Sequence, residues 1–244
     1  MSHIVITGHS RGVGAALALH FLEKGFSVLG LSRKPNEILA EKFPTLLREV
    51  SIDLSDVTAL ITWLKSDGLA TFLAPATAAY LVNNAGCLQP VGPLGTQDHA
   101  AIAKSIAVNI TAPFLLSDAL IAASSPGIQR RILHISSGVG RHPCAGWSVY
   151  SATKAALDHH ARSAALDAVI NLKIASIAPG VIDTDMQEEI RNSDPQKFPL
   201  LEQFHALKQN GQLDSPADCA HKLALFLLSD SFENGDIADV RDRK

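Results

Sequence analysis

Short apolar runs alternate along the chain with longer segments in which apolar residues recur every three or four positions. The short runs predict strands at residues 4–7, 28–31, 48–52, 79–83, 132–136, 173–177 and 237–240. The longer periodic segments predict helices at residues 13–24, 57–64, 99–123, 149–169 and 216–228. Because strands that alternate with helices form βαβ units, the pattern predicts a parallel sheet with right-handed crossovers.

The length and composition fit one globular domain. The chain has 244 residues, of which 47% are hydrophobic and 18% are charged, and this supplies enough apolar material to cover a parallel sheet on both faces. We therefore expect a single domain over residues 1–244. Segment 183–215 is long, irregular and interrupted by helix breakers, and a connection of this length is typical of a substrate lid.

Charge and cysteine content restrict the partners. The net charge is −3 without a Lys/Arg cluster, which argues against nucleic acid or an anionic membrane as the main partner. Cys87, Cys144 and Cys219 form no CxxC motif, as suits a reducing compartment. A signal peptide is not expected, and the apolar runs look too interrupted to span a bilayer, so we expect a cytoplasmic protein. The ten histidines include no HExxH motif, and no metal is expected.

A glycine-rich segment, TGHSRGVG at residues 7–14, joins the first predicted strand to the first predicted helix. Gly8 permits a tight turn, while Gly12 and Gly14 remove side chains where a diphosphate would approach backbone N–H groups and the helix N-terminus. The spacing is GxxxGxG rather than GxGxxG, and three glycines can also form only a tight turn. The position between a strand and an Ala-rich helix favours the dinucleotide site.

The end of the second predicted strand bears on the choice between NAD and NADP. An acid at this position would bind the 2′-hydroxyl of the adenine ribose, and Ser32 stands there instead. Arg33 and the loop residue Arg11 can clamp a 2′-phosphate from two sides, because a guanidinium binds phosphate through two parallel hydrogen bonds. The alternative is a pair of solvated surface arginines. We expect NADP(H).

Tyr150 and Lys154 are four residues apart in a predicted helix and therefore share one of its faces. A nearby ammonium stabilises a phenolate and lowers the pKa of the tyrosine from its ordinary value of about 10. The pair can then act as a general acid in reduction or as a base in oxidation. YxxxK is frequent by chance, and a packed tyrosine beside a surface lysine is the alternative.

Three further features lie near this pair in the predicted fold. Ser137 follows the fifth predicted strand, at the sheet edge where ligands bind, and can donate a hydrogen bond to a carbonyl oxygen; a turn serine is the alternative. Asn109 lies inside the predicted helix 99–123, where an amide is unfavourable and, if buried, needs partners. We expect it to bend the helix and to hold a water near Lys154. The small residues of NNAG, 83–86, let the backbone pass close to a cofactor, although they also suit a plain turn.

Taken together and in this order, these motifs resemble the short-chain dehydrogenase/reductase family, from Ile4 to about Val240. The resemblance implies a Rossmann-like doubly wound sheet of seven mostly parallel strands with helices on both faces. It implies that the catalytic residues are Asn109, Ser137, Tyr150 and Lys154. With the loop residues above, the expected NADP(H)-binding positions are Gly8, Ser10, Arg11, Gly12, Val13, Gly14, Ser32, Arg33, Asp53, Leu54, Asn83, Ala85, Gly86, Tyr150, Lys154, Pro179, Gly180, Ile182 and Thr184.

Segments 146–150, 179–187 and 233–236 are most similar to the sepiapterin reductase-like branch, especially to bacterial benzil reductases, which form a hydroxyketone from an aromatic diketone. The resemblance implies an NADPH-dependent carbonyl reductase that transfers the pro-S hydride to an apolar or aromatic ketone or 1,2-diketone, with Tyr150 as general acid. The expected substrate pocket is apolar, although ordinary core packing under a lid is the alternative. Its residues are Leu88, Val139, Cys144, Trp147, Met186, Phe198, Leu201 and Phe204.

Two other functions remain open on the sequence. The protein could be a regulatory module that binds NADPH without consuming it, against which the complete Asn/Ser/Tyr/Lys set argues. It could also be an NAD-linked alcohol dehydrogenase. The ending 239–244 lacks the Gly-Gly of many family members and puts a C-terminal tetramer interface in doubt. We expect a homodimer that packs through the helices after His99 and after Val149.

Overall fold

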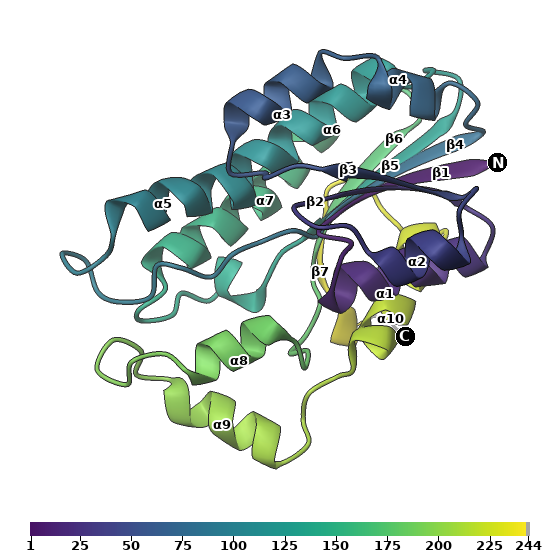
Figure 1. The fold of residues 1–244 in the computed structure, drawn as a ribbon. Helices are drawn as coiled ribbons and strands as arrows, with labels where there is room; N and C mark the ends of the chain where they lie inside the picture. The colour runs from purple at the N-terminus through teal and green to yellow at the C-terminus, as the bar shows by residue number, and fades with distance from the viewer. Residues whose placement is uncertain (243–244) are drawn as a thin grey trace.

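The computed structural model of the protein describes residues 1–242, so the last two residues of the expected domain lie outside it. Its centre is a seven-stranded parallel sheet in the order β3-β2-β1-β4-β5-β6-β7 (Figure 1). The strands are β1 (Ser2–Thr7), β2 (Ser27–Ser32), β3 (Leu47–Ser51), β4 (Ala78–Asn83), β5 (Gln129–Ile135), β6 (Leu172–Ala178) and β7 (Asp236–Asp239). The expected Rossmann-like single-domain fold is confirmed.

Helices cover both faces of the sheet (Figure 1). One face carries α1 (Gly12–Glu23), α2 (Glu37–Lys42) and α10 (Pro216–Leu228). The other carries α3 (Val57–Leu64), α4 (Gly68–Leu73), α5 (His99–Ile106), α6 (Ala112–Ala123) and α7 (Ser148–Leu166). Successive side chains of β1 point to opposite faces, so Ile4 packs in the cluster of α1 and Val5 in the cluster of α6. This two-sided burial explains the continuous apolar character of the strand.

The predicted helix 99–123 is interrupted. A π-helical turn, η1 (Ala107–Thr111), separates α5 from α6 and contains Asn109. Such turns are rare and are found frequently at functional sites. Among the described residues, this stretch of 25 residues is the one helix long and apolar enough to cross a membrane, a test that core helices also pass. Leu116 and Leu120 of α6 are buried in the cluster that includes β4 residue Leu81.

Segment 183–215 is not irregular, and that prediction is wrong. It contains α8 (Asp185–Arg191) and α9 (Leu201–Gln209), which lie together beyond one edge of the sheet (Figure 1). Its two ends are joined by the bridge between Ile182 and Asp214, so it leaves and rejoins the domain at one place. Helices of seven and nine residues are too short to be stable alone, and packing of Phe198 against Trp147 supports them. Movement of this segment as a lid stays a prediction.

Candidate active site

A cavity of about 1320 Å³ opens at the carboxyl ends of the strands. Pockets for drug-sized ligands occupy roughly 300–1,000 Å³, so this one has room for a dinucleotide and a small substrate. All predicted cofactor positions except Asn83 line it, namely Gly8, Ser10, Arg11, Gly12, Val13, Gly14, Ser32, Arg33, Asp53, Leu54, Ala85, Gly86, Tyr150, Lys154, Pro179, Gly180, Ile182 and Thr184. The sheet edge therefore gathers residues from the whole length of the chain.

The glycine loop has the shape that a diphosphate requires. Gly8 and Gly12 have φ values of 71° and 56°, in the left-handed region that favours glycine. A Cβ on Gly14 would lie 2.1 Å from the carbonyl oxygen of Gly8, so only glycine permits this close turn. Arg11, the N-cap residue of α1, makes no side-chain hydrogen bond to the first turn of the helix. The residues present thus fit an anionic group held at the N-terminus of α1.

Asn83 does not line the cavity, and its predicted role in cofactor binding is wrong. Its side chain is buried on the other side of β4, where Nδ2 lies 3.3 Å from Oγ of Ser117 and 3.1 Å from Nδ1 of His134. The next residue, Asn84, lines the cavity instead. Its Nδ2 donates to the carbonyl oxygen of Thr7 at 2.9 Å and joins the ends of β4 and β1. The two asparagines differ because neighbouring side chains at a strand end point in opposite directions.

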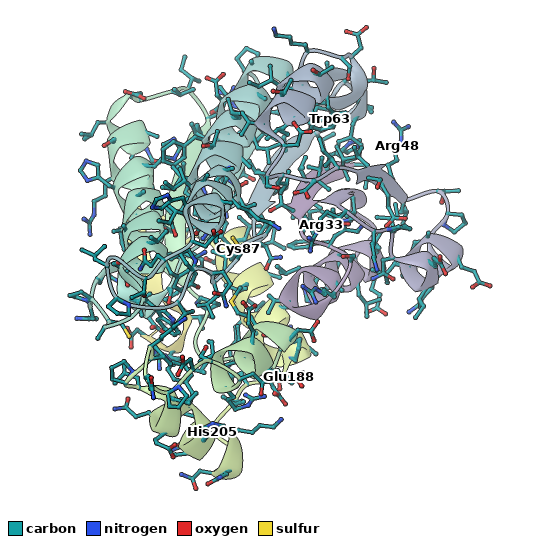
Figure 2. The ribbon with its side chains drawn as sticks, turned by 60° about the vertical axis from the view of Figure 1, so that its left-hand side comes forward. Arg33, Arg48, Trp63, Cys87, Glu188 and His205 are labelled. Atoms are coloured by element: carbon teal, nitrogen blue, oxygen red, sulfur yellow. The ribbon has the colours of Figure 1, made fainter. Side chains whose placement is uncertain are left out.

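The ends of β2 and β3 are followed by Arg33 and Asp53, two of the predicted cofactor-binding residues. Arg33 is exposed and lines the cavity, and its carbonyl oxygen accepts a hydrogen bond from Ser51 at 3.1 Å. In the view of Figure 2, Arg33 lies within the outline of the molecule, whereas Arg48 points away from it at the margin. Asp53 accepts hydrogen bonds from the backbone N–H and the hydroxyl of Ser55, and these lower its pKa. Asp53 is therefore ionised at neutral pH and fixes the turn in which it lies.

Arg11 has a partner that the sequence pattern did not reveal. Its Nη1 lies 2.5 Å from Oδ2 of Asp185 in α8, and each side chain is 68% exposed. An ion pair this exposed contributes little to stability, about 0–1 kcal/mol. Its consequence is positional, because it connects the glycine loop to segment 183–215 across the mouth of the cavity.

Three predicted catalytic side chains converge from β5 and α7. Tyr150 and Lys154 are both buried, and Nζ of Lys154 lies 5.6 Å from the centre of the Tyr150 ring. Nζ donates to the carbonyl oxygen of Ile135 at 2.8 Å, which fixes the ammonium at the end of β5. Ser137 makes a side-chain hydrogen bond with Tyr150 and also accepts the N–H of Val139 at 3.4 Å. It is thus both a turn serine and a neighbour of the phenol.

The pKa values of the pair differ from the sequence expectation. Burial raises the pKa of Tyr150 to about 12, and the hydrogen bond with Ser137 offsets this only in part. Burial also lowers the pKa of Lys154 to about 8. The expected net lowering of the tyrosine pKa is therefore wrong for this geometry, because desolvation of the phenolate is the largest cause of the shift and raises the pKa. Tyr150 holds its proton throughout the neutral range, as a general acid must.

Asn109 joins the loop after β4 to helix α7. Its Oδ1 accepts the N–H of Cys87 at 2.9 Å, and its Nδ2 donates to the Cys87 carbonyl at 2.9 Å and to Oγ1 of Thr153 at 3.1 Å. A Cβ on Gly86 would lie 3.4 Å from Oδ1 of Asn109 and 3.6 Å from Nζ of Lys154. A small residue at position 86 therefore leaves the space between the Asn109 amide and the Lys154 ammonium open. The water expected near Lys154 stays a prediction.

Four of the predicted substrate-pocket residues form an apolar wall beside Tyr150. They are Val139, Trp147, Met186 and Phe204. The indole of Trp147 meets the ring of Tyr150 edge-on, with centroids 5.6 Å apart, and also contacts Phe204 at 5.5 Å. A flat apolar substrate would therefore contact aromatic surface next to the phenol.

Four predicted pocket residues do not line this cavity, and those assignments are corrected. Leu88 and Phe198 are fully buried behind the wall, where Phe198 stacks on Trp147 with centroids 4.5 Å apart. Leu201 is buried in the same cluster. Cys144 lines a separate hollow of about 520 Å³. The apolar character of these residues was predicted correctly. The sequence pattern does not distinguish residues that line a cavity from residues that pack behind the lining.

The cavity also contains charged residues that sequence reasoning missed. Arg241 lines it and binds Asp239 through two hydrogen bonds, of 2.8 and 2.7 Å, which hold the pKa of Asp239 below its usual range. Cδ of Arg241 would lie 3.8 Å from a Cβ on Gly180. The signal was available, because Asp239 ends β7 and the carboxyl ends of parallel strands meet at one edge.

Comparison with known proteins agrees with this geometry. Residues 2–195 match the family model described as short chain dehydrogenase. The chain is 32% identical to a benzil reductase ((S)-benzoin forming) of Bacillus cereus, over 98% of this chain and 99% of that protein. It is 31% identical to a sepiapterin reductase of Meriones unguiculatus, over 98% and 95%. The predicted similarity to this branch is confirmed.

Solved structures show the same arrangement. A short-chain dehydrogenase/reductase from Burkholderia vietnamiensis has a TM-score of 0.73 and 40% identity, over 100% of this chain and 98% of that chain. A 4-hydroxyisoleucine dehydrogenase complexed with NADH has a TM-score of 0.80 and 26% identity, and a blue fluorescent protein from a metagenomic library in complex with NADPH has 0.79 and 25%; each comparison covers 98% of this chain and 96% of the other. The chain belongs to the short-chain dehydrogenase/reductase family, whose members are oxidoreductases that bind a nicotinamide cofactor.

Proposed function

We propose that the protein is an NADPH-dependent carbonyl reductase that converts an apolar or aromatic ketone, or a 1,2-diketone, to the corresponding alcohol. The observation that carries this proposal is the buried phenol of Tyr150 beside the aromatic wall of Trp147, in a cavity whose other end carries Arg33. The similarity to a benzil reductase supports an aromatic diketone as substrate.

The residues around the carbonyl would act as follows. The nicotinamide, when bound, supplies the hydride. Ser137 and Tyr150 donate hydrogen bonds to the carbonyl oxygen, where negative charge grows. Tyr150 then gives its proton to that oxygen, which is favourable because an alkoxide binds a proton more tightly than a phenolate does. The ammonium of Lys154, which lies 5.6 Å from the phenol ring, stabilises the phenolate that remains.

The preference for NADPH rests on charge at the second strand end. Ser32 places no carboxylate there, and its hydroxyl donates to the carbonyl oxygen of Lys34 at 2.5 Å. Arg33 and Lys34 both line the cavity, so two cations are available for a 2′-phosphate. A carboxylate at this position would repel the phosphate and favour NADH.

The test is a reduction assay with benzil and a panel of ketones. The decrease in the absorbance of the reduced nicotinamide is measured with NADPH and with NADH. We expect turnover of aromatic diketones with NADPH, and we expect Arg33→Ala to weaken NADPH binding about 10–100-fold, as for loss of a charge-assisted hydrogen bond of about 1.5–3 kcal/mol, while NADH binding is unchanged. Arg48→Ala, an exposed change outside the cavity, is the control. No turnover of any carbonyl with either cofactor would exclude the proposed reaction, and equal binding of both cofactors would exclude the NADPH preference.

The homodimer and the cytoplasmic location stay predictions. Only 39% of the most apolar 18-residue stretch of helix 99–123 is buried, which leaves apolar helical surface for a second copy. Sedimentation velocity at micromolar concentration should give a species of twice the chain mass of 25.9 kDa, and a monomer would contradict the expectation.

A further inference from the structure

His9 occupies an unusual place within the glycine loop. Its side chain is completely buried, while its neighbours Ser10 and Arg11 line the cavity. The imidazole lies directly over Gly30 of β2, because a Cβ on Gly30 would come within 2.3 Å of the ring. The ring therefore lies between the glycine loop and β2. Only glycine at position 30 leaves room for it.

Beyond Gly30 the imidazole reaches the third strand. Gly30 and Glu49 are register partners in β2 and β3, and Nε2 of His9 lies 2.6 Å from Oε1 of Glu49. The same carboxylate oxygen accepts the backbone N–H of Asn36 at 2.7 Å. One oxygen atom thus connects the glycine loop to the residue that begins α2.

Asn36 completes a closed connection back to the loop. Its Nδ2 donates to the carbonyl oxygen of Ser10 at 3.5 Å, and its Oδ1 caps α2 by accepting the N–H of Leu39 at 3.1 Å. We call the connected residues His9, Glu49, Asn36 and Ser10 the His9 bridge. It spans the turn that carries Arg33 and Lys34, and it holds one end of that turn against the glycine loop.

We propose that the His9 bridge is a positioning device for cofactor selection: it sets the separation between the glycine loop and the Arg33–Lys34 turn, and so determines affinity for the 2′-phosphate of the cofactor. This inference rests on the proposed use of NADPH. The diphosphate would bind on one side of the bridge and the 2′-phosphate on the other. A fixed separation lowers the ordering cost of binding both groups at once.

The charge of Glu49 makes the proposal sharply testable. If this carboxylate acted only through its charge, its removal would strengthen binding of the anionic cofactor. If it acts through the bridge, Glu49→Ala should weaken NADPH binding about 10-fold, because the turn loses its anchor. Glu49→Gln removes the same charge but keeps an oxygen that can accept both hydrogen bonds, so it should bind NADPH within about 2-fold of the wild type.

The experiment measures dissociation constants of the full chain for NADPH and NADH by nicotinamide fluorescence, without substrate. We expect Glu49→Ala to weaken NADPH binding and to change NADH binding less than about 3-fold, with kcat at saturating NADPH within about 2-fold of the wild type. Glu41→Ala removes an exposed charge from α2 outside the bridge and is the matched control. If Glu49→Ala does not fold, Gly30→Ala displaces the imidazole and should give the same selective loss.

Three outcomes would overturn the proposal: unchanged or tighter NADPH binding in Glu49→Ala, equal weakening of NADPH and NADH, or a Glu49→Gln variant as weak as Glu49→Ala. Each can be separated from failure of the proposed function. If the wild type prefers NADPH and reduces diketones, and the variants keep that preference, only the positioning role of the His9 bridge is rejected. A wild type that binds both cofactors equally rejects the NADPH assignment, and the bridge with it.

Discussion

Replacing Tyr150 by phenylalanine is expected to lower kcat for diketone reduction by about 10²–10⁴-fold, the usual contribution of a general acid. The phenol is the proton donor in the proposed reaction, and phenylalanine keeps its ring against Trp147 while removing only the hydroxyl. The dissociation constant for NADPH should change less than about 3-fold, because the glycine loop and Arg33 are untouched. Stopped-flow turnover and fluorescence titration measure the two quantities separately.

Tyr80 offers the matched control, since it and Tyr150 are the two tyrosines of the chain. Tyr80 is buried in β4 and its hydroxyl contacts Gln129 at 3.2 Å, and neither residue lines the cavity. Tyr80→Phe should therefore retain wild-type kcat while removing the same atom from another buried phenol. If Tyr150→Phe retained more than about a tenth of the activity, another group would have to supply the proton.

The features that the sequence predicted well are local. The glycine loop depends on three glycines within seven residues, and the close approach of Gly14 to Gly8 follows from that spacing. Tyr150 and Lys154 share a helix face because four residues make about one turn. The parallel sheet follows from the alternation of strands and helices, so its confirmation needed no knowledge of side-chain contacts.

The features that were missed depend on the tertiary structure. Arg11 pairs with Asp185, which is 174 positions away, and no periodicity connects them. Asn83 and Asn84 were separated by one position, and that single step decides which side of β4 a side chain faces. The two short helices after Ile182 form on the packed surface around Trp147 rather than through their own propensity.

The pKa of Tyr150 is another feature that depends on the tertiary structure. The spacing to Lys154 suggested a lowered value, yet burial of the phenol raises it to about 12. Spacing shows which charge is near, whereas the cost of desolvation depends on everything that covers the group. The same cost applies to Lys154, and it has a consequence for stability as well as for catalysis.

Replacing Lys154 by methionine should stabilise the fold at pH 7 while lowering kcat by about 10²–10³-fold, since the phenolate loses its neighbouring cation. The folded protein holds the Lys154 proton with a pKa of about 8 against 10.5 in the unfolded chain, which costs on the order of 3 kcal/mol at pH 7. Loss of the hydrogen bond to the Ile135 carbonyl removes part of this gain. About 1–2 kcal/mol of net stabilisation should remain at pH 7.

The pH dependence distinguishes this cause from a general packing effect. Between pH 8 and 10.5 the unfolded chain keeps a proton that folded Lys154 has lost, so wild-type stability gains from this group as pH rises. Lys154→Met lacks that gain, and its advantage over the wild type should shrink by about 2 kcal/mol between pH 7 and 9.5. Urea unfolding at several pH values measures the difference, with Lys104→Met, an exposed lysine of the same cavity, as control. An advantage that stayed constant with pH would mean that the buried ammonium carries no desolvation cost.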